Sequence, residues 1–373
     1  MRCFVRNYAL PLLLIAAAAP ACANAQPAPA TEAVAAAPFV AADAMTVVEA
    51  LATALDENFV FPDKGKAYAA ALRAKLASGG YASFASADAF AEAVTDDLQA
   101  IHADGHLRLH PPRTGEEGQA RAMRRPPIDG AIGKSGWIAD GIAYISFGSF
   151  PGDEATVARL RGFLAAHSSA ETLIIDARTH RGGGLAEMDA MFPYFYAEPR
   201  TLVQMDTRVA AEQRHGSPLE ETPELVKVAA PDGVVRRSHN VIPASEATAL
   251  RDAKIYLLTS ERTASAAEHL SLSLKRIGRA TLIGETTAGA GHYGGMVPLG
   301  GGYSAFVPVG RTFDPETNQG WEGTGVAPDV AVPAERALVE ALTRSGVAPA
   351  EAERLSGEYQ PEGSMKRRRP KAI

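Results

Sequence analysis

The sequence of 373 residues contains only two cysteines, Cys3 and Cys22, and both lie close to the N-terminus. If this segment is removed on export, the mature chain has no cysteine. Disulfide bonds, a cysteine nucleophile and thiolate metal sites are then excluded. Basic residues are not in excess either, and the formal net charge of −6 gives no reason to expect a nucleic acid as partner.

A long hydrophobic run is also missing. The apolar stretch over residues 8–19 follows two arginines and is too short to span a bilayer. Three small residues, Ala23-Asn24-Ala25, come next and fit a cleavage site. We therefore interpret residues 1–25 as a secretory signal and expect an exported protein, periplasmic or secreted, with no membrane span after signal removal. Lipid anchoring at Cys22 is the alternative, although its upstream pattern is poor.

The remaining chain divides by composition and periodicity. A Pro- and Ala-rich stretch is typical of a linker. Three groups of apolar residues at helical spacing follow it and predict a small helical domain. The C-terminal end is polar and basic, which favours a solvated tail. The expected parts are the linker (26–42), the helical domain (43–110), an α/β core (126–346) and the tail (347–373).

Within the core, buried strand patterns alternate with amphipathic helix patterns, as is typical of an α/β fold with parallel strands. Residues 209–250 are polar and weakly periodic, and we assign no structure to them. The expected elements are strands at 172–176, 254–259 and 279–284, helices at 153–167, 185–196, 265–277 and 333–345, and hairpins at 136–145 and 296–313.

Ser265 lies where a predicted strand gives way to a predicted helix. Together with Glu268, three residues later, it forms a capping-box pattern, and helix capping is the simplest interpretation. A second interpretation is a nucleophile at a helix N-terminus, where backbone N–H groups and the helix dipole stabilise an oxyanion. The two roles are compatible.

A glycine-rich loop, Gly182-Gly183-Gly184, follows the strand at 172–176. Ligand sites of open α/β sheets gather at the carboxyl ends of the strands, so we expect this loop and Ser265 to face one crevice. Glycine N–H groups, with that of Ala266, would then form an oxyanion hole. A tight turn is the plainer explanation of the glycines. No Lys-Ser or Lys-Thr follows them, which argues against a phosphate cradle.

A serine nucleophile needs a base. Residues 106–110 alternate like a strand, which would place His106 and His110 roughly 13 Å apart. Ligands of one zinc ion must lie within about 4 Å of each other, so we expect no metal at these histidines. No cofactor is expected either. The candidate bases are His102, His106, His110, His180 and His292.

Four motifs in this order resemble those of the C-terminal-processing (tail-specific) serine peptidase family, which includes the tricorn protease core and interphotoreceptor retinoid-binding protein. The resemblance covers roughly residues 45–335 and implies a crotonase/ClpP-like spiral α/β core preceded by a small N-terminal helical domain. A peptide or protein would be the substrate. The motifs are 104–109 (DGHLRL), 176–184 (DARTHRGGG), 263–268 (TASAAE) and 322–329 (EGTGVAPD).

The resemblance implies site residues. The lysine of the processing peptidases' Ser/Lys dyad is missing, since the corresponding stretch reads TTAGAGH up to His292. The tricorn-like branch uses serine, histidine and glutamate instead, which implies Ser265 as nucleophile, His106 as base and Glu322 as its orienting carboxylate. His292 is the alternative base. The implied oxyanion hole consists of the N–H groups of Ala266 and of Gly182 or Gly183.

Three departures from the family pattern bear on function. His180 stands where the family usually has asparagine, and Gly105 stands where tricorn has serine. Too few residues separate His110 from the core for a PDZ domain, so recognition of substrate C-termini cannot be carried over.

A non-catalytic binding module for an apolar ligand or peptide remains an alternative function, as does a small-substrate esterase or amidase. An acyl-CoA enzyme on the related core fits poorly with export.

Overall fold

The computed structural model describes residues 37–112, 130–246, 248–361 and 363–366. The predicted signal segment, most of the predicted linker and the basic residues after Lys366 lie outside this part of the chain. All of the described residues belong to one compact unit. Among the described residues, no helix combines the length and the apolar character that a membrane crossing requires.

The core sheet has six strands in the order β12-β9-β8-β4-β3-β2. Its first five strands are parallel to their neighbours, and β2 closes one edge as the antiparallel arm of a hairpin with β3. The strands are β2 (Ile132–Ala139), β3 (Ile142–Phe147), β4 (Thr172–Asp176), β8 (Lys254–Thr259), β9 (Thr281–Gly284) and β12 (Val330–Ala331). The predicted parallel α/β core and its hairpin are confirmed.

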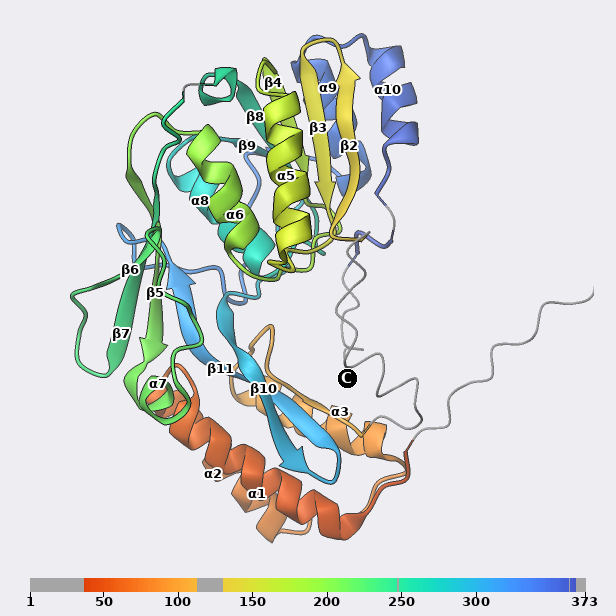
Figure 1. The fold of residues 1–373 in the computed structure, drawn as a ribbon. Coiled ribbons are helices and arrows are strands. Elements are labelled where there is room, and N and C mark those ends of the chain that lie inside the picture. The colour runs from red at the N-terminus through yellow and green to blue at the C-terminus, as the bar shows by residue number, and fades with distance from the viewer. Residues whose placement is uncertain (1–36, 113–129, 247, 362, 367–373) are drawn as a thin grey trace, which may run out of the picture. The chain divides into compact units, whose positions relative to one another are not determined.

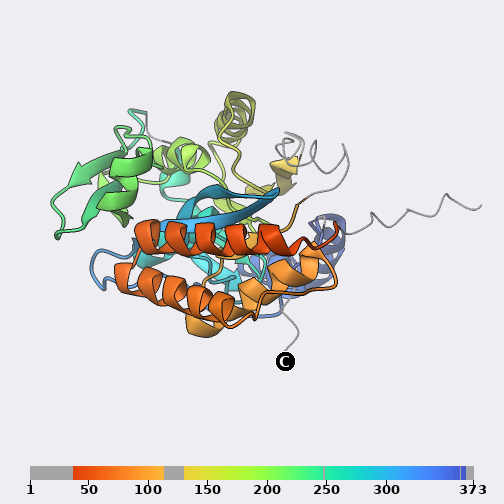
Figure 2. The ribbon, with the colours of Figure 1, turned by 90° about the horizontal axis from the view of Figure 1, so that it is seen from below.

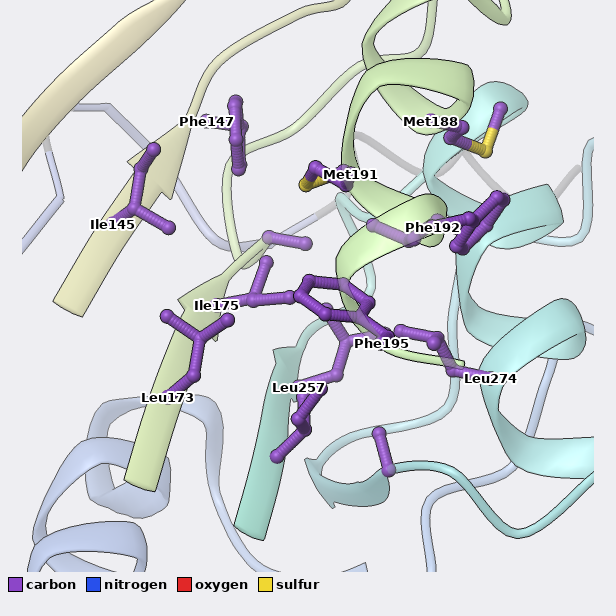
Figure 3. Close-up of a cluster of buried hydrophobic side chains, with 14 of the residues drawn as sticks. Ile145, Phe147, Leu173, Ile175, Met188, Met191, Phe192, Phe195, Leu257 and Leu274 are labelled. Carbon is purple, nitrogen blue, oxygen red and sulfur yellow. The ribbon is translucent and has the colours of Figure 1, made fainter. Parts of the chain in front are cut away.

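Helices cover both faces of this sheet (Figure 1). One face packs against α5 (Glu154–Ala166), α6 (Ala186–Met191) and α8 (Ala266–Arg276), and the other against α9 (Ala337–Arg344) and α10 (Pro349–Glu358). Successive residues of a strand point to opposite faces, so β4 sends Leu173 and Ile175 into the first layer and Ile174 into the second. Figure 3 shows the first layer, where aromatic and methionine side chains of α6 and the residues after it fill the space above the strands.

A second sheet is antiparallel throughout and has the order β1-β11-β5-β7-β6, with β10 also paired to β11. Two of its strands, β6 and β7, come from the stretch 209–250 to which the sequence analysis assigned no structure. Its strands are β1 (Arg108–His110), β5 (Arg200–Arg208), β6 (Leu225–Val228), β7 (Val234–Val241), β10 (His292–Gly300) and β11 (Tyr303–Phe313), and α7 (Val209–His215) follows β5.

The three predicted N-terminal helices are α1 (Ala41–Asn58), α2 (Pro62–Ala77) and α3 (Ala87–Ile101). Their apolar faces share a core with β1, β10 and β11, and α1 and α2 run side by side (Figure 2). The N-terminal helical region and the α/β core thus follow the expected fold class.

Two expectations about elements need correction. Residues 349–358, assigned to a polar tail, form α10, which buries Ala352 and Leu355. The helix expected over 185–196 ends at Met191 and continues as a short 3₁₀ turn over Phe192–Tyr194, because Pro193 has no N–H with which to extend an α-helix.

Candidate active site

Ser265 is the residue that precedes the first turn of α8, and its backbone has φ 57° and ψ −118°. A positive φ costs an L-residue other than glycine roughly 1–2 kcal/mol, so the surrounding contacts must hold it in place. Its N–H donates to Oε2 of Glu268 at 2.9 Å, which bears out Glu268's predicted role at this helix start. Ser265 also lines a cavity of about 210 Å³.

Glu268 joins the start of α8 to the loop before β10. Its two carboxylate oxygens accept the N–H groups of Gly289 and Ala290, at 2.7 and 2.8 Å, and the hydroxyl of Thr287 at 2.6 Å. Burial raises the pKa of this carboxyl group to about 7, even though these hydrogen bonds favour the charged form. The same side chain therefore fixes Ser265 and the loop that leads to His292.

The glycine loop and the serine loop are bound to each other, as expected of two loops at the carboxyl ends of neighbouring strands. The N–H of Ala264 donates to the carbonyl of His180 at 3.0 Å, and the Thr263 hydroxyl donates to the carbonyl of Ala177 at 2.8 Å. Gly183, Gly184 and Ser265 line the same cavity. The predicted common crevice is present.

Two of these glycines are required by close approach. A Cβ on Gly182 would lie 2.7 Å from the Cβ of Ser265, and a Cβ on Gly183 would lie 1.9 Å from the carbonyl oxygen of Phe150. Both residues also have positive φ, at 103° and 138°. No side chain fits at either position, so the loop backbone lies directly against the serine.

The oxyanion-hole prediction needs one correction. The N–H of Gly182 donates to Nδ1 of His180 at 3.0 Å and is therefore engaged within its own loop. Within the described part of the chain, the N–H groups of Gly183 and Ala266 have no hydrogen-bond partner, and both residues line the Ser265 cavity. Of the two glycines considered, Gly183 is the one that fits the role.

His180, the departure from the family pattern, holds this loop in place. It is fully buried, and burial lowers the pKa of its imidazole to about 3, so the ring is neutral. A neutral imidazole has one acceptor nitrogen, here Nδ1, as the amide oxygen of asparagine would provide. His180 thus accepts the N–H of Gly182 through Nδ1, and this engagement of its acceptor nitrogen in a fully buried ring excludes His180 as a base.

A second cluster lies beside this cavity and is centred on His292, the first residue of β10. Nδ1 of His292 lies 2.7 Å from Oδ2 of Asp104, and both residues are buried. Burial alone would raise the pKa of Asp104, but the hydrogen bonds from His292 and from the backbone N–H groups of His106 and Leu107 outweigh it and lower the pKa. Asp104 therefore fixes the orientation of the His292 ring.

Glu322 lies in the same cluster. Its carboxylate accepts the N–H groups of Gly105, Gly291 and His292 at 2.6, 2.6 and 2.9 Å. Burial, followed by repulsion from Asp104, raises the pKa of Glu322. This loop carboxylate thus links the N-terminal helical region to the start of β10.

His106 also belongs to the cluster. One of its ring nitrogens lies within 4.8 Å of carboxylate oxygens of both Asp104 and Glu322, and its ring stacks on Phe306 with centroids 5.0 Å apart. His292, not His106, lines the 210 Å³ cavity together with Ser265. The structure thus brings His106, His292 and Glu322 together around Asp104, and among the histidines of this cluster only His292 shares the cavity of Ser265.

Asp104 is a site residue that the sequence analysis missed. It was visible as the first residue of the DGHLRL motif, but nothing local indicated a bond to a histidine 188 positions away. Asp104, His106 and Glu322 would also offer one nitrogen and two oxygens to a cation, a set different from the histidines first considered.

Comparisons with known proteins place this site in a family. The model of peptidase family S41 matches residues 141–332, and that of the N-terminal domain of Peptidase_S41 in eukaryotic IRBP matches residues 30–129. No PDZ domain is evident in the part of the chain that the structure describes.

Solved structures share the fold at low sequence identity. A photosystem II D1 C-terminal processing protease is 15% identical, with a TM-score of 0.51 over 84% of this chain and 100% of its own. A candidate peptidase from Parabacteroides merdae is 18% identical, with a TM-score of 0.55 over 82% of this chain and 97% of its own. A lipoprotein from Streptococcus agalactiae is 15% identical, with a TM-score of 0.51 over the same shares. The predicted resemblance is confirmed, and the chain belongs to peptidase family S41.

Proposed function

We propose that the protein is a serine endopeptidase whose nucleophile is Ser265. The observation that carries this proposal is the conformation of Ser265: a serine with φ 57° stands at a helix N-terminus and lines a cavity with the amides of Gly183 and Ala266. Capping alone does not require positive φ, because capping residues ordinarily adopt extended backbone. Backbone strain of this kind is concentrated at functional sites.

The reaction follows the serine-hydrolase scheme. The Ser265 hydroxyl oxygen bonds to the scissile carbonyl carbon while its proton passes to a histidine. The N–H groups of Gly183 and Ala266 receive the negative oxygen. The histidine then gives the proton to the leaving amine as the C–N bond breaks. Water repeats the sequence on the acyl-enzyme and releases Ser265.

For the base we propose His106, oriented by Glu322, as the family resemblance implies. A specific observation favours His292 as the second candidate: it shares the Ser265 cavity, and Asp104 binds its Nδ1, which leaves Nε2 for a proton transfer. The single variants His106→Ala and His292→Ala distinguish them, because loss of the base lowers the rate far more than loss of a neighbour.

A peptide substrate is favoured over a small ester by the surface next to the cavity. Pro218 and Gly294 line both the 210 Å³ cavity and a neighbouring one of about 500 Å³, which follows β10 from Gly294 to Pro298. Among the described strands, β10 pairs with β11 alone, so its other edge is open to an extended chain. Peptides bind such edges through main-chain hydrogen bonds.

We also propose that the protein is exported, because residues 1–25 have the pattern of a secretory signal. Intact mass of the protein recovered from expressing cells tests this: a chain beginning at Gln26 is expected. A lipid adduct at Cys22 would show anchoring, and a chain beginning at Met1 would contradict export.

The central test is intact mass after exposure to a fluorophosphonate probe, with Ser265→Ala as control. One adduct on the wild type and none on the variant is expected. The labelling rate should rise with pH through the histidine range, since the base must be neutral. No adduct on folded protein would contradict the proposal and favour the binding module.

A further inference from the structure

A chain of three polar side chains, two buried histidines and a partly buried aspartate, lies beside the Ser265 cavity and takes no part in the mechanism above. Nε2 of His239 lies 2.7 Å from Oδ1 of Asp189, and Nδ1 of His239 lies 2.8 Å from Nε2 of His269. The three residues come from α6, β7 and α8 and are brought together from distant parts of the sequence. His239 is 0% exposed and His269 is 3% exposed.

The order of donors and acceptors along this chain is fixed from the Asp189 end. An ionised carboxylate only accepts, so Nε2 of His239 carries the hydrogen. In the neutral form of His239, Nδ1 is then an acceptor, and the hydrogen between the rings belongs to Nε2 of His269. Nδ1 of His269 is left as an acceptor. Burial lowers the pKa of His269 well below its ordinary value, which keeps this ring neutral.

His269 lies close to the reacting residue along α8. It lies four positions after Ser265 at the start of α8, and residues so spaced are neighbours on one face of a helix. Helical side chains lean toward the N-terminus of their helix, which directs the imidazole toward Ser265. His269 accordingly lines the same cavity as Ser265.

Beside the polar side chains of His292, Tyr293 and Thr312, the cavity wall also has apolar side chains. Among the described residues they include Leu185, Met205, Leu219 and Trp321, whose ring centroid lies 6.3 Å from that of His269. A polar acceptor beside apolar side chains is the arrangement by which binding pockets select one kind of group. A charged side chain would lose its hydration there without a partner of opposite charge.

We propose that His269, held by His239 and Asp189, accepts a hydrogen bond from the substrate side chain that occupies the Ser265 cavity. The enzyme would then prefer an uncharged side chain that ends in a donor, such as glutamine, tyrosine or threonine, over an apolar one of similar size. This inference rests on the proposed peptidase function and concerns its substrate class. Asp189 and His239 are positioning residues, since they act only through His269.

The first experiment measures kcat/KM of the wild-type protein on peptides that differ only in the residue placed in this cavity. The matched pairs are glutamine and methionine, tyrosine and phenylalanine, and threonine and valine. A site that hydrogen-bonds a polar group discriminates against the analogue without it, and we expect the donor of each pair to be favoured by about tenfold or more. Equal rates, or a preference for the apolar member of a pair, would overturn the proposal.

The second experiment changes the chain of hydrogen bonds without touching the cavity. The Asp189→Asn amide can donate to His239 as well as accept, so the donor order is no longer imposed and the preference should fall toward unity. Rates on the apolar peptides should stay within about threefold of the wild type, because these peptides make no bond to His269. Glu187→Gln is the control, as Glu187 is buried on the same helix and binds Gly152 instead. A preference unchanged in Asp189→Asn would contradict the relay.

Two further measurements separate the possible failures. Nitrogen NMR of the ¹⁵N-histidine-labelled wild-type protein shows whether Nδ1 of His269 is unprotonated, as we expect. This measurement needs no variant, so it does not depend on whether a variant folds. A protonated Nδ1 would overturn the inference. Fluorophosphonate labelling of Ser265 tests the peptidase function separately. If Ser265 is labelled but the enzyme shows no preference for donor side chains, only this inference is wrong. If Ser265 is not labelled, the proposed peptidase function is wrong.

Discussion

At the scale of single residues, the site depends on backbone positions that accept no side chain. Gly182 lies against Ser265 with φ 103°, so its replacement meets steric overlap and backbone strain together. The serine itself has positive φ, and the contacts between the two loops described above hold it in place. The addition of a single methyl group at Gly182 should therefore change the reactivity of Ser265.

Gly182→Ala is expected to lower the labelling rate of Ser265 at least tenfold and to destabilise the fold by about 1–3 kcal/mol, the cost of a strained backbone position. Gly184→Ala is the matched control, because its Cβ would lie 3.9 Å from the nearest atom and its φ is not positive. Labelling kinetics and thermal unfolding measure the two effects. Equal behaviour of the variants would show that the close approach is not important.

His180 gives a prediction for acid stability. Burial lowers the pKa of His180 to about 3 in the folded protein, whereas an unfolded histidine titrates near about 6.5. Between these values the unfolded chain binds a proton that the folded protein does not, so stability falls as the pH falls from about 6.5 toward 3. Asparagine does not titrate, yet its oxygen still accepts the N–H of Gly182.

His180→Asn should therefore make this decline shallower by up to about 1.4 kcal/mol per pH unit, the value for one linked proton. Urea unfolding at a series of pH values measures it. His215→Asn, at an exposed histidine, serves as the control and should leave the slope unchanged. A slope in His180→Asn as steep as that of the wild type would contradict the assignment of this proton.

At the scale of elements, α10 is a helix that the sequence pattern did not predict. Its stretch is rich in charge, with Arg354 between Glu351 and Glu358, and reads as a solvated tail. Only Ala352, Leu355 and Ser356 are buried in it. This narrow buried face is enough because α9 and the second face of the core sheet already offer an apolar surface.

Leu355→Ala should destabilise the protein by about 2–3 kcal/mol, as removal of a buried leucine side chain leaves a cavity. Arg354→Ala removes exposed ion pairs from the same helix and should cost less than about 1 kcal/mol. Urea denaturation measures both, and labelling of Ser265 in the folded protein should be unaffected. The prediction fails if the two substitutions cost the same.

At the scale of the whole molecule, the N-terminal helical region and the α/β core complete the site together. Gly105 and Asp104 follow α3, yet the N–H of Gly105 donates to Glu322, and Asp104 binds His292. A Cβ on Gly105 would lie 2.8 Å from Cα of Ala290. The glycine that replaces the serine of tricorn is thus required by contact between two distant segments of the chain.

Gly105→Ala is expected to separate these segments and to lower Ser265 labelling at least tenfold, since a misplaced catalytic group loses about that much per fraction of an ångström. Gly130→Ala, where no atom lies within 4 Å of the added Cβ, is the control. Circular dichroism checks that the folded state persists. Wild-type labelling of Gly105→Ala would show that the contact does not position the site.

The sequence by itself determined the features that depend on neighbouring residues. Strand and helix periodicity located the parallel core and placed Ser265 at a helix start, and motif order indicated the family. Tertiary structure alone decided which groups meet: Asp104 with His292, the N–H of Gly182 with His180, and Asp189 with His239 and His269. These pairings depend on how far apart the packed helices and strands lie. Hydrophobic periodicity predicts each element separately and does not determine the distance between two of them. For the same reason, the weak periodicity of the stretch around 209–250 did not predict its structure. Only the tertiary structure shows that β7 lies in this stretch and brings His239 next to His269.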